Sequence, residues 1–341
     1  MRSIILFSSA VVATCALVAA IVVLGPGISE PDTRSRGAAS PSSSVREVAS
    51  LAPVAPSLYV DPNSPSAKEV ATLTAAGALA EASKIREISS QPGAIWLTGS
   101  PTGSALTTSL QRYVTAARSA GAVLVFVTYA IPNRDCGGYS AGGLTASGYI
   151  EWTRTIAAAL AGTGSMVIVE PDALAMLSKP ACSTVQSTRL PLLQQAVGIL
   201  AGAGLKVYLD AGHAGWTSPS TMAPLLQKAG VSAATGFATN VASFHATSVE
   251  VSYANQISAL VGGKHYVIDV SRNGAGSQPT WCNPPGAALG QNPTFISGQG
   301  GLDALLWVKS PGLSDGSCNG APAAGAWYES YALTLIANRG Y

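Results

Sequence analysis

Short apolar, β-branched runs alternate with longer alanine- and leucine-rich stretches through most of this 341-residue chain. The runs predict strands that are buried on both faces. They span Ala94–Leu97, Val123–Tyr129, Met166–Glu170, Lys206–Asp210, Thr235–Ala238, Tyr266–Val270 and Ala304–Val308. Apolar residues at helical spacing lie between them, for example in Leu106–Ala120, Tyr149–Ala161 and Leu190–Ala203. This alternation predicts an α/β fold with a parallel sheet, either a closed β/α barrel or an open doubly wound sheet.

The composition excludes several classes of function. Only 11% of the residues are charged, the formal net charge is +2, and no block of like charges occurs, which argues against nucleic acid as a partner. The three histidines, His213, His245 and His265, lack metal-ligand spacing, so we expect no metal. No G-x-G-x-x-G motif follows the first strand, which argues against a dinucleotide cofactor. A neutral, hydroxyl-rich partner fits this chain better.

The first 56 residues differ from the rest. Arg2 precedes an apolar stretch over residues 4–24, which predicts either a signal peptide or an uncleaved membrane anchor. Residues 25–56 are rich in serine, proline and alanine, as is typical of a flexible linker. We therefore expect an exported protein, secreted or anchored through residues 4–24, with one folded domain over residues 57–341. We expect that domain to be a monomer.

Cysteine usage agrees with export. Cys15 lies in the apolar leader, which leaves four cysteines in the folded part: Cys136, Cys182, Cys282 and Cys318. An even number in an exported chain predicts two disulfides, although four cysteines allow three connectivities. Four buried free thiols are the alternative.

Polar residues follow nearly every predicted strand. Asp135 comes after the second run, and Asp172 after the third. In a barrel of parallel strands, catalytic groups lie at the carboxyl ends of the strands. Two aspartates at that edge suggest hydrolysis of a glycosidic bond, which needs one carboxyl to protonate the leaving oxygen and a second carboxylate for the other face of the sugar. A charged Asp135 nearby would raise the pKa of Asp172, and Asp315 could supply a further carboxylate.

Each of these residues also has a structural interpretation. Asp172 could be a helix N-cap. Asp269 could form an ion pair with Arg272, and Asp210 could be a buried acceptor that holds its loop. His213 is expected to contact substrate or anchor a loop rather than act as a base. The hypothesis therefore depends on the whole set, together with tryptophans that could cover sugar rings: Trp96, Trp216 and Trp281.

Several motifs together resemble glycoside hydrolase family 6, which contains endoglucanases and cellobiohydrolases. The first two are Tyr129-Ala-Ile-Pro-Asn-Arg-Asp-Cys136 and Val169-Glu-Pro-Asp-Ala-Leu-Ala175. The others follow in family order: Tyr208–Trp216, Gly236–Val241, Val267–Gly274, Trp281–Gly286 and Leu306–Gly316. The resemblance runs from about Leu58 to the C-terminus. It implies a distorted barrel of seven parallel strands and hydrolysis of β-1,4-glucan with inversion, without a cofactor.

The resemblance also implies roles for individual residues. Asp172 matches the general acid, and Asp135 matches the aspartate that keeps this acid protonated and helps to position the attacking water. Tyr129 matches the tyrosine near the distorted sugar, and Asp315 a debated base that also contacts substrate. The matched substrate contacts are Trp96, Ser140, His213, Trp216, Asn240, Trp281 and Lys309. The implied disulfides are Cys136–Cys182 and Cys282–Cys318.

Two departures from the family pattern could weaken substrate binding or shift specificity. Leu313 stands where the family commonly has a glutamate, and no further aromatic follows Trp96. The loops after Asp135 and over residues 310–326 are short, so we expect an open cleft and endoglucanase action. The alternatives are a cellobiohydrolase, a hydrolase of another β-glucan, and a glucan-binding protein without activity.

Overall fold

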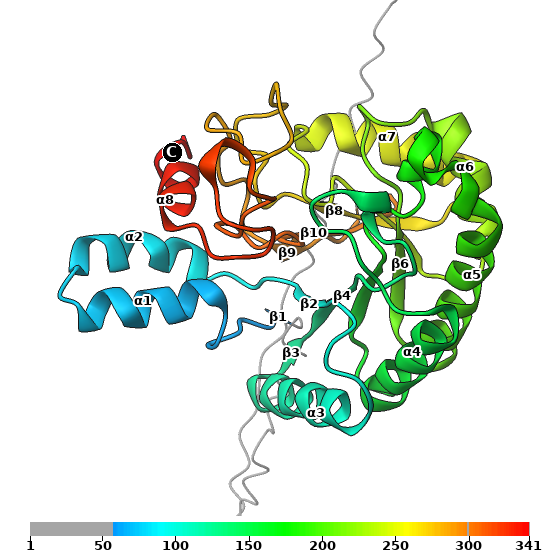
Figure 1. Cartoon of the computed structure of the whole chain (residues 1–341), viewed down its shortest axis with the longest axis horizontal. Coiled ribbons are helices and arrows are strands. Elements are labelled where there is room, and N and C mark those ends of the chain that lie inside the picture. Colours follow the sequence, from blue (N-terminus) through cyan, green and yellow to red (C-terminus); the bar gives the residue numbers. More distant parts are fainter. Residues whose placement is uncertain (1–56, 299, 341) are drawn as a thin grey trace, which may run out of the picture. The chain divides into compact units, whose positions relative to one another are not determined.

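The computed structural model describes residues 57–298 and 300–340 (Figure 1). The predicted leader over residues 1–24 and the linker over residues 25–56 lie outside the described residues. The described part is a mixed α/β domain built on one large sheet.

This sheet has eight strands in the order β2-β4-β5-β6-β7-β8-β10-β9. The first seven are parallel: β2 (Ile95–Leu97), β4 (Val125–Thr128), β5 (Met166–Val169), β6 (Lys206–Asp210), β7 (Gly236–Thr239), β8 (His265–Asp269) and β10 (Leu302–Leu306). The short β9 (Thr294–Phe295) adds antiparallel to β10. The prediction of seven parallel strands is therefore confirmed.

The parallel part of the sheet curves, so that its first strand, β2, and its last strand, β10, approach each other. The Ala94 amide donates to the Trp307 carbonyl at 2.9 Å, and the Trp96 indole donates to the Val308 carbonyl at 2.7 Å. No strand ladder joins β2 to β10 within the described residues. The sheet is thus a distorted barrel, closed at this seam by single hydrogen bonds rather than by strand pairing.

Alternating strand residues fill two separate cores. Val127, Ile168 and Tyr208 belong to a cluster inside the barrel, whereas Phe126 and Val167 belong to the cluster beneath the helices. Because successive side chains of a strand point to opposite faces, strands covered on both faces need apolar residues throughout. This requirement explains why the strand runs in the sequence are continuous.

Helices cover the outer side of the sheet. Helices α3 (Gly103–Ala120), α4 (Ala146–Leu160), α5 (Gln186–Gly202), α6 (Pro219–Lys228) and α7 (Thr247–Leu260) follow one another in an arc (Figure 1). The pair α1 (Pro65–Ala75) and α2 (Leu79–Ser89) lies beside α8 (Glu329–Ala337). The predicted strand over residues 123–129 divides, because β3 (Ala122–Val123) pairs with β1 (Ser57–Leu58) instead of joining the large sheet.

Candidate active site

The loop after β4 holds the Asp135 carboxylate. The Ser140 amide donates to Asp135 Oδ2 at 2.7 Å, and the Arg134 Nε donates to the Ser140 carbonyl at 2.7 Å. Arg134 also lies over the Tyr129 ring, 4.7 Å from its centroid. A side chain at position 138 would come within 2.5 Å of Asp135 Oδ2, so only glycine leaves room for the carboxylate there. The loop thus brings Tyr129, Asp135 and Ser140 together.

Asp172 lies at the start of the loop after β5 and is partly exposed. Its backbone has a left-handed φ of 70°, and its amide donates to Asp210 Oδ2 at 2.9 Å. Burial and the negative charge of Asp135 raise the pKa of Asp172 to about 6, against the opposing charges of Lys179 and Lys309. Asp172 caps no helix within the described residues. Its carboxyl therefore does not serve as a helix cap and lies beside the Tyr129 hydroxyl instead.

Left-handed backbone conformations outside glycine gather at these loops. They occur at Asn133, Asp135 and Cys136 after β4, at Glu170 and Asp172 after β5, and at Asn240 and Ala242 after β7. Such conformations are costly for residues with a Cβ atom and gather at functional sites. The strand ends are therefore held in geometries that the surrounding contacts must impose.

Three contacts fix the Asp135 and Asp172 loops to each other. Arg189 of α5 is buried and donates to the Ala173 carbonyl at 3.1 Å and to the Asn133 carbonyl at 2.8 Å. The disulfide Cys136–Cys182 crosses the same two loops, which is the pairing that the family resemblance implies. Glu170, also buried, accepts from the amides of residues 130 and 131 at 3.0–3.1 Å. Sequence reasoning missed Arg189, since nothing near it in the chain signals these contacts.

The loop after β6 carries His213 and Trp216. Asp210 is the buried acceptor that the sequence suggests, because its Oδ2 also accepts from the Gly212 amide at 3.1 Å. The His213 ring stacks on His245 at 4.6 Å, and burial and His245 lower the pKa of His213 to about 4. His213 is therefore uncharged at neutral pH and unsuited to carry a proton there. Its ring centroid lies 5.4 Å from that of Trp216.

Asn240, which the family resemblance matches to a substrate contact, points into the protein. It is fully buried, and its amide donates to the carbonyls of His245 at 3.1 Å and Asp269 at 2.9 Å. Its Oδ1 accepts from the His245 amide at 3.1 Å. All of these contacts are to backbone, so Asn240 holds loops together instead of facing a substrate. A polar residue at a strand end can point inward, and its sequence position alone does not distinguish the two cases.

Asp269 likewise binds backbone groups of neighbouring loops. This buried carboxylate accepts from four amides, those of Ala242, Ser271, Val308 and Lys309, at 2.9–3.2 Å. It thereby joins the loops that follow β7, β8 and β10. The predicted ion pair of Asp269 with Arg272 is wrong, because Arg272 binds Asp315 instead.

Asp315 lies in a buried ionic cluster. Its Oδ2 is 2.8 Å from Arg272 Nη1, and its Oδ1 is 3.0 Å from Lys309 Nζ. The Asn283 amide adds a hydrogen bond of 3.0 Å to Oδ2. Burial would raise the pKa of Asp315, but the two cations outweigh it and lower this pKa to about 2. The carboxylate is thus ionised, fully engaged and a weak proton acceptor.

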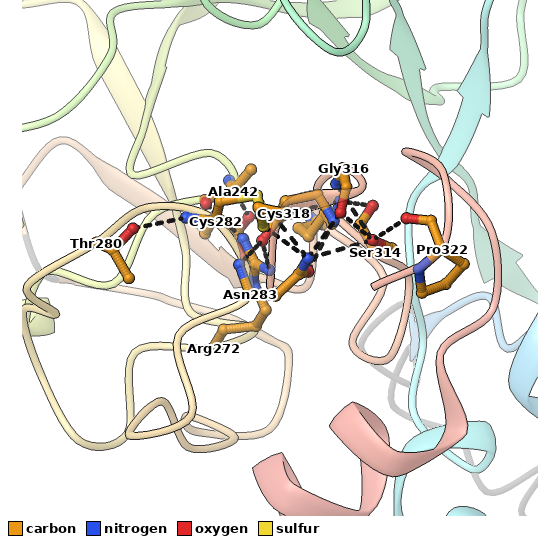
Figure 2. A network of polar contacts seen from close by, with 12 residues as sticks. Ala242, Arg272, Thr280, Cys282, Asn283, Ser314, Gly316, Cys318 and Pro322 are labelled. Atoms are coloured by element: carbon orange, nitrogen blue, oxygen red, sulfur yellow. Dashed lines mark hydrogen bonds and ion pairs between the residues drawn. A yellow bond between two sulfur atoms is a disulfide. The ribbon is translucent and has the colours of Figure 1, made fainter. Parts of the chain in front are cut away.

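Asn283 connects this cluster to the second disulfide (Figure 2). Its side-chain amide donates to Ser314 Oγ at 3.3 Å and to the Gly316 carbonyl at 3.0 Å. The neighbouring Cys282 is bonded to Cys318, again the pairing that the resemblance implies. The loops that contain Trp281 and Asp315 are therefore braced together.

Aromatic rings lie at several points around these loops. Trp96 is half-buried on β2, and its ring meets Tyr129 edge to face at 5.3 Å. Trp281 is 60% exposed and lies 5.9 Å from Tyr139, which sequence reasoning did not single out. The Lys179 ammonium lies 5.0 Å from the centroid of Trp216. Rings and hydrogen-bonding groups near paired carboxyls suit a sugar chain.

In the part of the chain that the structure describes, no group of three histidine, cysteine or acidic side chains is placed to hold a metal ion. No helix of residues 57–298 and 300–340 is long and apolar enough to cross a membrane.

Comparison with known proteins decides the family. The sequence profile of Glycosyl hydrolases family 6 matches residues 54–339. The chain belongs to this family. The expected fold and the expected glycoside hydrolase family are thereby confirmed.

Family 6 relatives of both classes, endoglucanases and cellobiohydrolases, are similar to this chain. Endoglucanase A of Cellulomonas fimi is 44% identical over 254 residues, covering 74% of this chain and 56% of that protein. The 1,4-β-D-glucan cellobiohydrolase C of Emericella nidulans is 31% identical, covering 62% of this chain and 60% of that protein. This chain therefore spans little more than half the length of these two family members.

A solved family 6 structure extends the comparison. The endoglucanase Cel6 from Mycobacterium tuberculosis, in complex with methyl-cellobiosyl-4-deoxy-4-thio-β-D-cellobioside, is 39% identical with a TM-score of 0.78. The match covers 84% of this chain and 98% of that one. The folded domain thus corresponds to almost the whole of a solved endoglucanase domain.

Proposed function

We propose that this protein is an exported endo-β-1,4-glucanase that hydrolyses internal bonds of cellulose-like glucan with inversion of configuration. The observation that carries this proposal is the placement of Asp172 at the end of a barrel strand beside Asp135, where burial and the Asp135 charge raise its pKa to about 6. A carboxyl that keeps its proton close to neutral pH can protonate a glycosidic oxygen. Relatives named endoglucanase, at 34–44% identity, support the same activity.

In the proposed reaction, Asp172 gives its proton to the glycosidic oxygen as the C1–O bond breaks. A water molecule attacks C1 from the opposite face and loses a proton toward Asp135, with Ser140 beside it. Tyr129 stays a neutral hydroxyl near the reacting sugar, because burial and the charges of Asp172 and Asp135 raise its pKa above the usual range. The negative charge of Asp135 thus keeps Asp172 protonated and also attracts the proton that the water molecule releases.

The remaining polar groups take supporting roles in this proposal. A carboxylate with a pKa of about 2, held by two cations, is a poor base, so we assign Asp315 to holding Lys309 rather than to proton removal. Trp96, Trp216 and Trp281 would cover sugar rings, and His213 and Lys309 would meet hydroxyls. Leu313, which is partly exposed, stands where the family commonly has a glutamate. Another β-glucan is therefore an alternative substrate.

We further propose that the protein works outside the cytoplasm as a monomer. Two disulfides support an oxidising environment, because thiols stay reduced in the cytosol. In this proposal residues 1–24 direct export, residues 25–56 act as a linker, and the catalytic domain covers residues 57–341.

Endo action predicts a particular course of hydrolysis of carboxymethylcellulose. Cuts within chains shorten them quickly, so viscosity should fall steeply while few reducing ends have formed. The measurement compares viscosity with reducing-sugar release over time. Release of mainly cellobiose with little loss of viscosity would indicate a cellobiohydrolase instead, as in the relatives so named. Binding without any product would indicate a glucan-binding protein.

A further inference from the structure

The two exposed aromatic side chains of the described part of the chain lie against each other. Tyr139 is 54% and Trp281 is 60% exposed, and their ring centroids are 5.9 Å apart at an interplanar angle of 50°. Tyr139 comes from the loop after β4, and Trp281 from the long segment after β8. Large aromatic surface left in water marks binding surfaces. We call Tyr139 and Trp281 the aromatic pair.

Tyr139 rests on a position that only glycine can fill. A Cβ atom at Gly316 would lie 2.7 Å from Cγ of Tyr139 and 3.0 Å from its Cβ. Gly316 directly follows Asp315 and lies two residues before Cys318, the disulfide partner of Cys282 (Figure 2). Trp281 directly precedes Cys282. The disulfide therefore braces both the ring that Tyr139 meets and the backbone on which it rests.

The loop that carries Tyr139 also carries Asp135. The next residue, Ser140, donates its amide to Asp135 Oδ2 at 2.7 Å. A shift of Tyr139 away from Gly316 would move this amide, which lies one peptide bond further along. Contact between Tyr139 and Gly316 thus bears on the position of Asp135.

We propose that the aromatic pair binds one glucose unit of the glucan chain, and that seating of Tyr139 on Gly316 positions Asp135. Two tilted rings offer two apolar surfaces to the C–H faces of a sugar, whereas Trp281 alone would offer a single surface. Tyr139 is thereby a substrate-contacting residue that also acts through Asp135. The inference rests on the proposed glucanase function.

Binding can be separated from catalysis by titrating cellohexaose calorimetrically into Asp172→Asn protein. Adding Tyr139→Ala should weaken binding roughly 5- to 10-fold, since one aromatic contact is lost. Adding Tyr139→Phe should keep binding within about twofold, because the ring is kept. Leu79→Ala, a truncation of an exposed residue on α2, is the control and should have no effect. Unchanged binding in the Tyr139→Ala protein would overturn the inference and leave the glucanase proposal standing. Absence of binding in Asp172→Asn alone would overturn both.

The positioning role is tested by a double-mutant cycle in otherwise active protein. Gly316→Ala and Tyr139→Ala should each lower kcat, and their combination should be no worse than Tyr139→Ala alone, because the Cβ atom added at position 316 displaces the same ring that Tyr139→Ala removes. The single variant Tyr139→Phe should keep kcat close to that of the wild type, because it keeps the ring. Effects that multiply in the double variant, or a kcat unchanged by Tyr139→Ala, would show that Tyr139 does not position Asp135. Thermal unfolding of each variant confirms that the comparison is made on folded protein.

Discussion

Asp172→Asn is expected to lower kcat on β-1,4-glucan by about 10²–10⁴-fold, the range for loss of a general acid. Asparagine keeps the size and polarity of the side chain but has no proton to transfer to the leaving oxygen. Binding of cellohexaose should stay within a few fold of wild type, because the backbone amide that Asp210 holds is unaffected. Reducing-sugar release from carboxymethylcellulose and calorimetric binding measure the two quantities. Full activity in this variant would show that Asp172 is not the general acid.

The same substitution should change stability in a pH-dependent way. The pKa of Asp172 is about 6 in the folded protein, above its ordinary value of 3.8. Below about pH 4 both folded and unfolded states hold the proton, so ionisation costs nothing. Above about pH 6 the folded state carries an unfavourable charge, and asparagine removes it. Tm should therefore rise on substitution at pH 8 but not at pH 4. An equal change in Tm at both pH values would contradict the raised pKa.

Arg272→Met is expected to destabilise the fold by about 3–5 kcal/mol at pH 7, the cost of removing one partner of a buried ion pair. Arg272 is fully buried and donates both to Asp315 and to the Ala242 carbonyl. Its loss leaves the Asp315 charge with Lys309 as its remaining cation. Urea unfolding measures the change. Arg112→Met, at an exposed arginine of α3, is the control and should change stability by less than about 0.5 kcal/mol.

The pH dependence of the Arg272→Met effect identifies its cause. A pKa of about 2 for Asp315, below the ordinary 3.8, means that its ionisation stabilises the fold above about pH 4. This contribution is lost as pH falls from about 4 toward 2. The stability difference between wild type and variant should therefore narrow over that range. A difference that stays constant would attribute the effect to packing around Arg272 rather than to charge.

The strand pattern was readable from the sequence because of a physical requirement. A strand covered on both faces needs a continuous apolar run, and Met166–Val169 and Lys206–Asp210 end where polar residues begin. The barrel then places Asp135 and Asp172 at the same edge of the sheet. The α1 helix also had a signal, Ser64 followed by Pro65, where Ser64 Oγ accepts from the Ala67 amide.

What the sequence could not reveal are partners distant in the chain. Arg272 pairs with Asp315, 43 residues away, whereas the nearer Asp269 binds backbone amides. Asn240 and Asp210 both follow strands, and only the packed structure shows that both point into the protein. Tyr139 was missed because a single tyrosine in a glycine-rich loop has no periodic or motif signal. Its meaning arises from Gly316 and Trp281, which folding brings to it.

The stereochemistry of the first product tests the central account most directly. Cellohexaose hydrolysed by the wild-type protein can be followed by proton NMR within the first minutes, before the anomers equilibrate. Attack by water, with Asp172 as acid and no covalent intermediate, predicts that the new reducing end appears first as the α-anomer. Initial appearance of the β-anomer would require a carboxylate nucleophile and a double displacement, and would contradict the roles given to Asp172 and Asp135.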